Sequence, residues 1–511
     1  MLPNEWERVL KNLSRQFVEG ESQIGKILAL SYEDLPYHLK SCFLYIGVYP
    51  EDYEFFAKEL NRLWGAEGFV QTLEEATEDC LVELIQRSLI QIVKRSSIGG
   101  VKSCQIHDLL RDLSISKAKE EKFLDGDTNS LSPCKARRLN MHHGISKYTS
   151  LNQSTPCLRS ILCFTLDTEK VENNQLKLLC GRFHFRRVLH LHKIEVEEFP
   201  NEIGTLIHLR YLAIQGEYNL ERLPSSIANL RNLQTLEVDK CDGIDVPSVI
   251  WKMQQLRHVR VQGRIISEGP KAGELSFPSN LQTLKYIEAG DWIEDCLGKL
   301  INLKKLGIST LELSGHVKEL LDSIPKLDHL QSLTLRGSNS RRIPFPPILN
   351  LQYLYKLNLV RGLEKLPESC EFSPNLTKFT LSESKLMQDP MTTLEKLPNF
   401  RILKLLAFSY LGREMVCSAQ GFPQLDSLFM CILPNLEEWR VEEGAMQRLV
   451  HLHMSQWFQL KMFPEGLQHV TALRKLELYH MSRSFTNRLQ QDMGEDWHKI
   501  QHIPSVNIFP P

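Results

Sequence analysis

The sequence of 511 residues has no apolar run that approaches the roughly 18 residues needed to span a membrane. Its first residues, MLPNEWERVL, also lack the basic-then-apolar layout of a signal peptide. The twelve cysteines are scattered and form no C-x-x-C pair, so we expect reduced thiols and a cytoplasmic location. These absences argue against a secreted protein held by disulfides and against a membrane-spanning receptor.

Neither sign of charge is in excess, since the chain has 61 Lys and Arg residues and 62 Asp and Glu residues. A balanced chain gives no general reason to expect binding to nucleic acid or to a membrane surface. The motifs H-E-x-x-H and G-x-S-x-G are absent, and we expect no catalytic residues, no metal site and no enzymatic activity. The HLH stretch near residue 190 and HLHM near 451 put histidines at alternate strand positions, where we expect them to be solvated.

One glycine-containing stretch imitates a nucleotide site. In GESQIGK, the residues Gly20, Gly25 and Lys26 have the spacing of the phosphate-binding P-loop, G-x-x-x-x-G-K-[ST]. The next residue is Ile27, whereas the motif needs a hydroxyl there to hold magnesium. The residues upstream, NEWERVLKNLSRQF, have their apolar side chains at helical rather than strand spacing. We therefore interpret this stretch as part of a helical region and not as a phosphate loop.

An internal repeat occupies the chain from about residue 186 onward. The pattern apolar-x-x-apolar-x-apolar recurs every 22 to 27 residues, as in HLRYLAI, NLQTLEV and HLQSLTL. This spacing is typical of leucine-rich repeats, in which each coil has one short strand and an irregular or helical return. Thirteen copies predict a parallel sheet about 60 Å long. The second apolar position of the copies falls at Leu189, Leu212, Leu236, Val259, Leu284, Leu306, Leu333, Leu357, Phe379, Leu403, Leu428, Leu452 and Leu476.

These apolar positions are core residues, because a single coil cannot bury its apolar side alone. Recognition must then use the residues between them, which point outward on the concave side by strand alternation. Between Val259 and Leu403 this outward set includes His258 and many basic residues but no Asp or Glu. Two interpretations stay open: solvated side chains whose partners lie on the returns, or a basic stripe that docks an acidic protein surface. The basic residues are Arg260, Lys285, Lys305, Arg336, Lys356, Lys378 and Lys404.

The first 125 residues have a different pattern. Apolar residues at helical spacing predict helices over residues 3–13, 24–35, 37–50, 57–70 and 73–90. Residues 89–106 read as two strands joined by a Ser/Gly turn, and 107–123 as a further helix. Helices followed by a hairpin suggest a winged helix. Residues 51–83 contain ten acids and only Lys58 and Arg62 as bases, which disfavours binding to a DNA backbone.

Several motifs in the first 125 residues, together with the repeats, resemble those of a known family. CFLYIGVYPEDYEF, LNRLWGAEGFV and QIHDLLRDLSISKAKEEKF, followed by degenerate leucine-rich repeats, look like plant intracellular NB-ARC leucine-rich-repeat disease-resistance proteins of the coiled-coil class. The fold class we expect is an α/β leucine-rich-repeat solenoid with a curved parallel sheet, preceded by a mainly helical winged-helix domain. The resemblance implies a division into a remnant helix of the NB-ARC helical subdomain at 1–22, a winged helix at 23–125, a connector with irregular first repeats at 126–185, about 13 repeats at 186–481 and a tail at 482–511.

The family's winged helix carries a Met-His-Asp motif, which matches Ile106, His107 and Asp108. The resemblance implies that this histidine contacts the β-phosphate of ADP in full-length relatives. An alternative is that Asp108 simply caps a helix. Relatives also carry a signalling domain, a P-loop and a Walker-B strand ahead of such a segment, so we expect an N-terminally truncated member with no cofactor and no binding of ADP or ATP.

The resemblance implies a fragment of a plant innate-immune receptor linked to the hypersensitive response. Its repeats would recognise a pathogen effector or a guarded host protein and take part in autoinhibition. The alternative is a non-catalytic cytosolic adaptor, such as a substrate receptor of a ubiquitin ligase. Residues 1–125 carry 15 basic and 21 acidic residues. We therefore expect an intramolecular contact in which an acidic surface packs against the basic repeats, through Glu74, Glu75, Glu78 and Asp79.

Overall fold

The computed structural model describes residues 23–70, 74–125, 137–142, 145, 158–181, 186–216, 220–239, 243–266, 278–309, 315–337, 342–491 and 493–509. The chain divides into two compact units, Met1–Cys241 and Asp242–Pro511, which are treated in turn as the first and second unit. The segment 1–22, with the helix expected over residues 3–13, lies outside the described residues.

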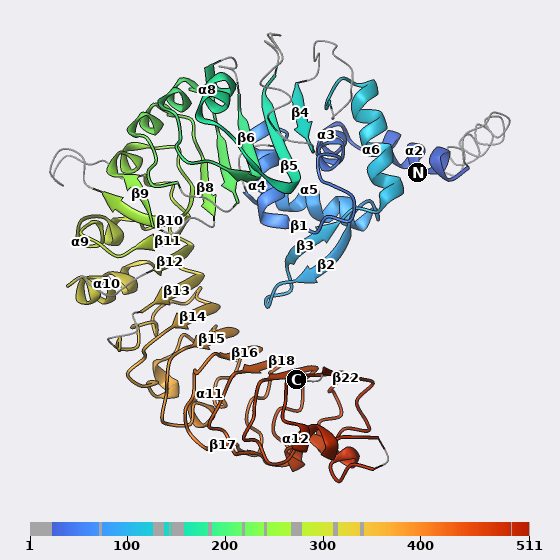
Figure 1. Ribbon diagram of the computed structural model, residues 1–511, viewed down its shortest axis with the longest axis vertical. Helices are drawn as coiled ribbons and strands as arrows, with labels where there is room; N and C mark the ends of the chain where they lie inside the picture. The colour runs from blue at the N-terminus through green and yellow to red at the C-terminus, as the bar shows by residue number, and fades with distance from the viewer. Residues whose placement is uncertain are drawn as a thin grey trace. The chain divides into compact units, whose positions relative to one another are not determined.

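The first unit begins with helices packed against a small antiparallel sheet (Figure 1). The hairpin expected over residues 89–106 is present as β2 and β3, and β1 pairs with the other edge of β3. Helices and hairpin share one apolar core around Phe43, Leu60 and Trp64. The elements are α2 (Gln23–Glu33), α3 (Tyr37–Ile46), β1 (Phe55–Phe56), α4 (Ala57–Glu67), α5 (Glu74–Gln86), β2 (Gln91–Arg95), β3 (Val101–Gln105) and α6 (Asp108–Glu120).

Parallel strands follow in the first unit, and they begin earlier than the repeat pattern indicates. Within the segment expected to be a connector, β5 pairs in parallel with both β4 and β6 and is therefore an interior strand of the sheet. The connector thus already contains repeat-like coils. The elements are β4 (Arg138–Met141), β5 (Ser160–Lys170), α8 (Asn173–Gly181), β6 (Val188–Glu195), η1 (Asn201–Thr205), β7 (Tyr211–Gln215), η2 (Ser225–Asn229) and β8 (Thr235–Asp239).

The second unit is a run of parallel strands, each paired in register with the next. Leu333 lies opposite Leu357, which lies beside Phe379 on the following strand. Stacking of the repeat leucines coil upon coil is therefore confirmed. The strands of this sheet are β9 (Ile244–Pro247), β10 (His258–Ile266), β11 (Thr283–Glu288), β12 (Lys305–Ser309), β13 (Ser332–Arg336), β14 (Lys356–Val360), β15 (Lys378–Ser382), β16 (Ile402–Leu406), β18 (Ser427–Cys431), β20 (His451–Ser455), β21 (Lys475–Tyr479) and β22 (Ser505–Phe509).

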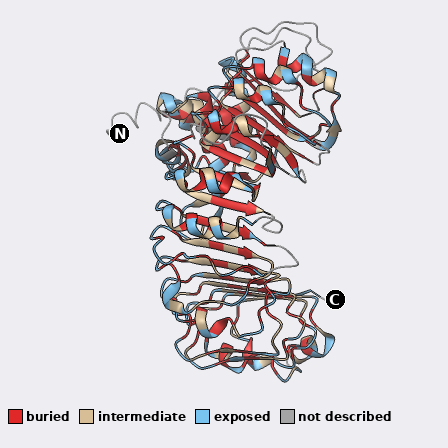
Figure 2. Ribbon diagram, turned by 90° about the vertical axis from the view of Figure 1, so that its left-hand side faces the viewer, coloured by how far each residue is buried: buried red, intermediate tan, exposed pale blue. Residues whose placement is uncertain are grey.

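From β14 to β21, side chains along the strands of the main sheet alternate between buried and half-buried. In β14, Leu357 and Leu359 are buried, whereas Lys356, Asn358 and Val360 are half-buried. The same alternation runs through β15, β16, β18, β20 and β21 (Figure 2). It defines two faces of the sheet: one packs into the core, and the other, called the concave face below, carries the residues available for recognition.

The returns are short helical turns, and several of them begin after proline. Pro200, Pro224, Pro247 and Pro464 each precede a single 3₁₀ turn. Proline suits this position because it fixes φ and has no N–H that would need a partner. Helical returns, several of them begun by proline, connect successive strands. In the second unit these are η3 (Ser248–Lys252), α9 (Trp292–Cys296), η5 (Leu297–Lys299), α10 (Val317–Ser323), η6 (Ile324–Lys326), η7 (Ser369–Glu371), α11 (Met391–Leu394) and η8 (Glu465–His469); β17 (Glu414–Cys417) and β19 (Glu438–Val441) form a separate two-stranded sheet.

The C-terminal segment 482–511 is more than the tail we expected. It contains α12 (Arg483–Arg488) and η9 (Trp497–Lys499), and β22 pairs with β21 in the main sheet. Asp496 and Lys499 are both buried in this segment and form an ion pair of 2.9 Å. The apolar side of the last repeat has no further repeat to pack against. This segment covers it, which is the role of terminal caps in repeat proteins.

Candidate functional site

The residues expected from the family nucleotide motif lie at the start of α6. His107 is the N-cap of this helix, and its Nδ1 accepts a hydrogen bond of 3.3 Å from the backbone N–H of Leu109. Asp108 is the first residue of the helix and not its cap, so our alternative for Asp108 is wrong. Because Nδ1 accepts, the neutral His107 ring carries its proton on Nε2. The exposed imidazole thus has a donor that an anion could use.

The stretch that imitates a P-loop is helical where the structure describes it. Gly25 and Lys26 lie within α2. The helical part of our interpretation is confirmed for residues 23–26. Ile27 still stands where a phosphate loop needs a hydroxyl to hold magnesium.

The winged helix docks on the first repeats through α4. At its C-terminal end, Glu67 lies 3.0 Å from Arg138 of β4 and accepts a hydrogen bond of 2.5 Å from Ser160 of β5. One turn earlier, Arg62 forms an ion pair of 2.9 Å with Glu237 of β8. All of these side chains are buried or nearly so. The name "α4 joint" is used below for the contact made by Glu67, Arg62, Arg138, Ser160 and Glu237.

The acids that we expected to pack against the basic repeats take no part in the α4 joint. Glu75, Glu78 and Asp79 of α5 are exposed in the first unit, and the side chain of Glu74 lies outside the described residues. The reason is that α4 is almost wholly buried and contacts β6 and β7, whereas the acids of α5 stay at the surface. The signal that sequence reasoning missed was the pair Arg62 and Glu67 on a helix that also carries buried Leu and Trp side chains.

The histidine of the HLH stretch is also part of the docked region. His190 is fully buried between the rings of Phe164 and Tyr211, at centroid distances of 5.0 and 5.9 Å. Our expectation of a solvated histidine is wrong here, because the winged helix covers this coil. Burial lowers the pKa of His190 to about 4, so the imidazole is neutral at physiological pH. It acts as a packed ring and not as a ligand.

The expected basic residues all lie on strands of the second unit. They extend from Arg260 of β10 to Lys404 of β16. Most are half-buried, and Arg336 at the end of β13 is exposed. His258 differs: it is buried, and its Nδ1 lies 3.2 Å from Thr283 Oγ1, so it does not belong to the surface.

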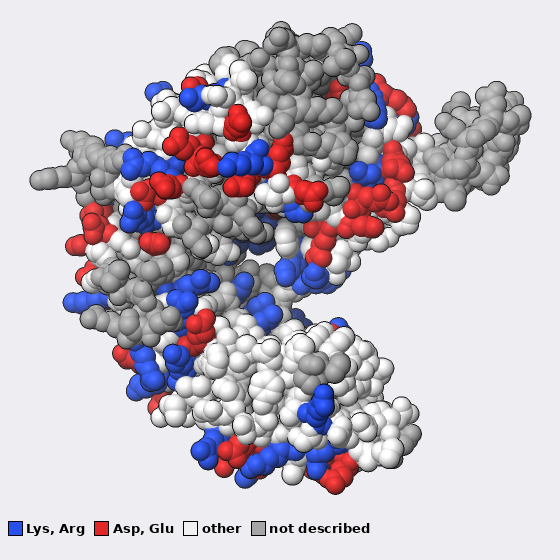
Figure 3. All heavy atoms as spheres, viewed as in Figure 1, with Lys and Arg blue, Asp and Glu red and all other residues white. Residues whose placement is uncertain are grey.

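The strand register shows that these residues form rows and not a single column. Lys356 lies directly opposite Lys378, and Lys305 lies in the same row with Ser332 between. Arg260 and Lys285 are opposite each other in a neighbouring row, which Lys404 joins further along. Successive strands are about 4.8 Å apart. The basic groups therefore spread across β10 to β16, and Figure 3 shows Lys and Arg gathered over β11 to β14.

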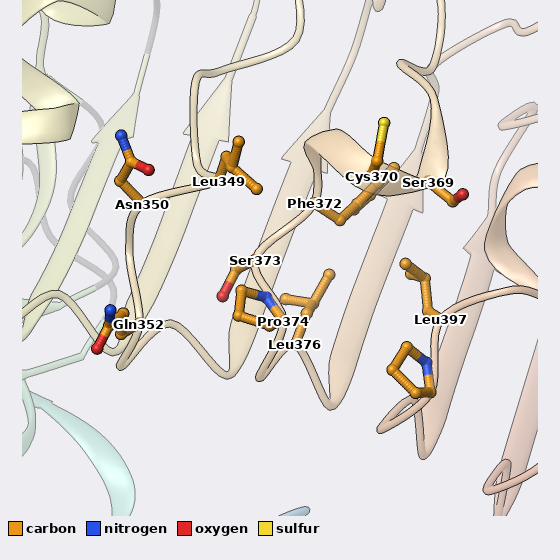
Figure 4. A pocket seen from close by; sticks show the side chains of 11 residues that line it. Leu349, Asn350, Gln352, Ser369, Cys370, Phe372, Ser373, Pro374, Leu376 and Leu397 are labelled. Carbon is orange, nitrogen blue, oxygen red and sulfur yellow. The ribbon is translucent and has the colours of Figure 1, made fainter.

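A pocket of about 780 Å³ lies on the returns of the central repeats (Figure 4). Its lining combines apolar side chains with short polar ones, and none of the lining residues that the structure describes is a Lys, Arg, His, Asp or Glu. It thus offers no charged side chain or histidine for acid–base catalysis or for binding a phosphate. The lining residues are Leu349, Asn350, Gln352, Ser369, Cys370, Phe372, Ser373, Pro374, Leu376, Leu397 and Pro398.

In the described part of the chain, no group of three or more His, Cys, Asp or Glu side chains is placed to hold a metal ion. The described helices include none that is both long and apolar enough to cross a membrane. Nine cysteines within the described ranges are free thiols.

Comparison with solved structures finds other repeat proteins. The plant peptide hormone receptor RGFR1 in complex with RGF2 matches 73% of this chain and 62% of its own, at 15% identity and a TM-score of 0.41. A Leptospira interrogans LRR protein matches 76% of this chain and 98% of its own, at 17% identity and a TM-score of 0.37.

Comparison with protein families gives two adjacent matches. Residues 48–114 match the disease resistance protein winged helix domain, and residues 157–502 match a leucine-rich repeat region. The first match covers α4 and the His107 helix start, and the second covers the strands from β5 to β21.

Curated relatives match along nearly the whole chain. The probable disease resistance RPP8-like protein 2 of Arabidopsis thaliana is 33% identical over 99% of this chain, and the disease resistance protein RPP8 of the same plant is equally similar. The disease resistance protein RPH8A of Arabidopsis thaliana is 34% identical. This chain spans 58% of the length of each of these relatives. It belongs to the family of plant disease-resistance proteins in which a winged helix precedes leucine-rich repeats.

Proposed function

We propose that this chain is the recognition part of a plant innate-immune receptor that acts in the cytoplasm and has no catalytic activity of its own. The disease-resistance relatives and the two matched domains support this role. The repeats would bind a pathogen effector or a guarded host protein, and the winged helix would couple that event to the rest of a receptor.

The concave face of the second unit is the proposed binding surface, and its rows of basic residues are the observation that carries the proposal. Lys305, Lys356 and Lys378 share one row, and Arg260, Lys285 and Lys404 share another. A field of one sign over neighbouring strands attracts a partner of opposite charge and repels partners of like charge. The proposed partner is therefore a protein with an acidic surface.

The α4 joint is the proposed element of restraint within the chain. Buried ion pairs connect α4 to β4 and β8, so the winged helix cannot turn against the first repeats without exposing unpaired charges. In a full receptor, the exposed Nε2–H of His107 would be placed to meet a nucleotide phosphate, as the family motif implies. For this chain alone we expect no nucleotide binding.

Charge reversal of the concave face should abolish partner capture. The variant combines Lys305→Glu, Arg336→Glu and Lys356→Glu, and immobilised full-length chain is used to capture proteins from extract of pathogen-challenged leaves. Reversing three charges replaces attraction by repulsion at the proposed surface. We expect the variant to capture at least about tenfold less of the proteins that the unmodified chain retains, which corresponds to roughly 1.4 kcal/mol of binding free energy.

A matched control reverses three lysines on the returns: Lys252→Glu, Lys318→Glu and Lys326→Glu. These side chains are exposed in η3, α10 and η6, and the net charge changes by the same amount. The control should capture as well as the unmodified chain. Equal capture by both triple variants, with unchanged melting curves, would favour solvated lysines and contradict the proposal.

A further inference from the structure

Beyond the basic rows, the concave face of the last coils becomes aromatic. Phe429 of β18, His453 of β20, Tyr479 of β21 and Phe509 of β22 lie on consecutive strands of the sheet. Neighbouring ring centroids are 5.8, 5.1 and 4.3 Å apart, and Tyr479 and Phe509 are stacked at an interplanar angle of 9°. These four rings are called the ring strip.

The ring strip is accessible and nearly neutral. Phe429, His453 and Tyr479 are half-buried, and Phe509 is exposed. Among the described residues, the acidic group beside them is Glu477, which accepts hydrogen bonds from His451 at 2.8 Å and from Lys475 at 2.6 Å. Its charge is thus compensated within the face. Figure 3 shows a wide area without charged side chains over these C-terminal coils.

The ring strip is continuous with the basic rows. Lys404 Nζ lies 4.2 Å above the centre of the Phe429 ring, a cation–π contact that joins the two surfaces. Lys378 and Lys356 follow on the two preceding strands. From Lys356 to Phe509 the face crosses seven strands of the sheet, β14 to β16, β18 and β20 to β22. At about 4.8 Å per step this is about 29 Å, the length of about nine residues of extended chain.

We propose that this combined surface binds an extended protein segment of about nine residues, with carboxylates at one end and aromatic or large apolar side chains at the other. The inference rests on the proposed function, because it specifies the partner of the same concave face. The carboxylates would lie over Lys356, Lys378 and Lys404. The rings would stack on Phe429, His453 and Tyr479, since aromatic pairs favour offset or edge contacts of this kind.

A single-stranded nucleic acid also combines negative charge with rings, but the face fits it less well. Its phosphates would run along the whole length, whereas the lysines are confined to one end of the surface. Glu477 would then lie under the phosphates in the middle of the ring strip. A segment with its acids at one end avoids both conflicts.

Binding of defined polymers to the full chain tests the inference. The probes are poly-Glu, a random Glu–Tyr copolymer and poly-U RNA, each followed by fluorescence anisotropy. We expect the copolymer to bind about tenfold tighter than poly-Glu. In the double variant Phe429→Ala with Tyr479→Ala, that ratio should fall to about twofold while poly-Glu binding is retained. Replacing Lys356 and Lys378 by Gln should weaken both acidic probes.

Two further variants guard against loss of folding. Phe429→Leu with Tyr479→Leu keeps apolar volume but removes the rings, and it should also lower the ratio. Phe408→Ala with Phe458→Ala removes exposed rings elsewhere in the second unit and should leave the ratio unchanged.

Each outcome decides the matter. A copolymer that binds no tighter than poly-Glu, or a ratio that survives loss of both rings, overturns the inference. In that case, poly-Glu binding that still depends on the lysines leaves the proposed function standing. If poly-Glu binding is unchanged when Lys356 and Lys378 are replaced, the result counts against the proposed function. The ratio of copolymer affinity to poly-Glu affinity still tests the ring strip. Poly-U binding that is tighter than copolymer binding overturns the inference in favour of nucleic acid.

Discussion

Replacing Glu67 with Ala is expected to destabilise the first unit by about 3–5 kcal/mol, the usual cost of removing one partner from a buried ion pair. Glu67 is buried, and its carboxylate lies 3.0 Å from the Arg138 guanidinium. That guanidinium is itself held between the rings of Phe69 and Phe123, at 4.7 and 4.0 Å. Without Glu67 it would stay buried as an uncompensated charge.

Hydrogen exchange of the full chain in urea, read by mass spectrometry on peptides from α4, β4 and β5, measures this effect in the first unit alone. The exposed Glu75→Ala serves as a control, which should change stability by no more than about 0.5 kcal/mol. Replacing both Glu67 and Arg138 by Leu should recover most of the loss, because no buried charge remains. A loss for Glu67→Ala no larger than that of the control would mean that the α4 joint is not held by this pair.

Replacing Asp496 with Ala is expected to loosen the C-terminal cap by about 3 kcal/mol, at the low end of the range for a broken buried pair. Asp496 accepts hydrogen bonds from Arg488 Nε at 2.8 Å and from the backbone N–H of Phe463 at 3.2 Å, and it lies 2.9 Å from Lys499. Lys499 is buried as well. Removal of the carboxylate would leave this ammonium group with fewer partners in the core.

The effect of Asp496→Ala should depend on pH. Burial alone would raise the pKa of Asp496, but the hydrogen bonds from Arg488 and Lys499 outweigh it and lower the pKa to about 2. An unfolded Asp has a pKa of about 3.9. The stabilisation is therefore complete above about pH 4 and is lost as the pH falls towards 2. Urea unfolding of the second unit at pH 7 and at pH 2.5 should show a smaller difference between variant and unmodified chain at the lower pH; a difference independent of pH would contradict this account.

The repeats were the most predictable part of the fold, because each leucine packs against the equivalent residue of the next coil. Positions from Leu189 to Leu476 all fall on strands, since the sequence period and the structural period are the same. The strands β4, β5 and β22 escaped the pattern. Their segments, such as RLNM of β4 and SVNIF of β22, contain too few of the apolar residues that define the repeat. They join the sheet by pairing with a neighbouring strand, which the sequence pattern does not show.

The α4 joint could not be predicted from composition, because it depends on partners far apart in sequence. Glu67 and Arg138, or Arg62 and Glu237, read as ordinary surface charges until the fold brings them together. We predicted a docking role for the acids of α5 only from the excess of acidic residues in that part of the sequence. The sequence could predict which side chains of the concave face point outward. The ring strip needed the register, which places Phe429 opposite His453, and the ring contact that Tyr479 makes diagonally with His453.

Lysine footprinting tests the central claim, that the concave face of the second unit is a surface for acidic protein, most directly. The full chain is acetylated with and without short poly-Glu, and the modification of each lysine is followed by mass spectrometry. The account predicts that poly-Glu protects Lys305, Lys356, Lys378 and Lys404, and leaves Lys252, Lys318 and Lys326 on the returns unchanged. Protection spread evenly over both sets, or confined to the returns, would contradict it.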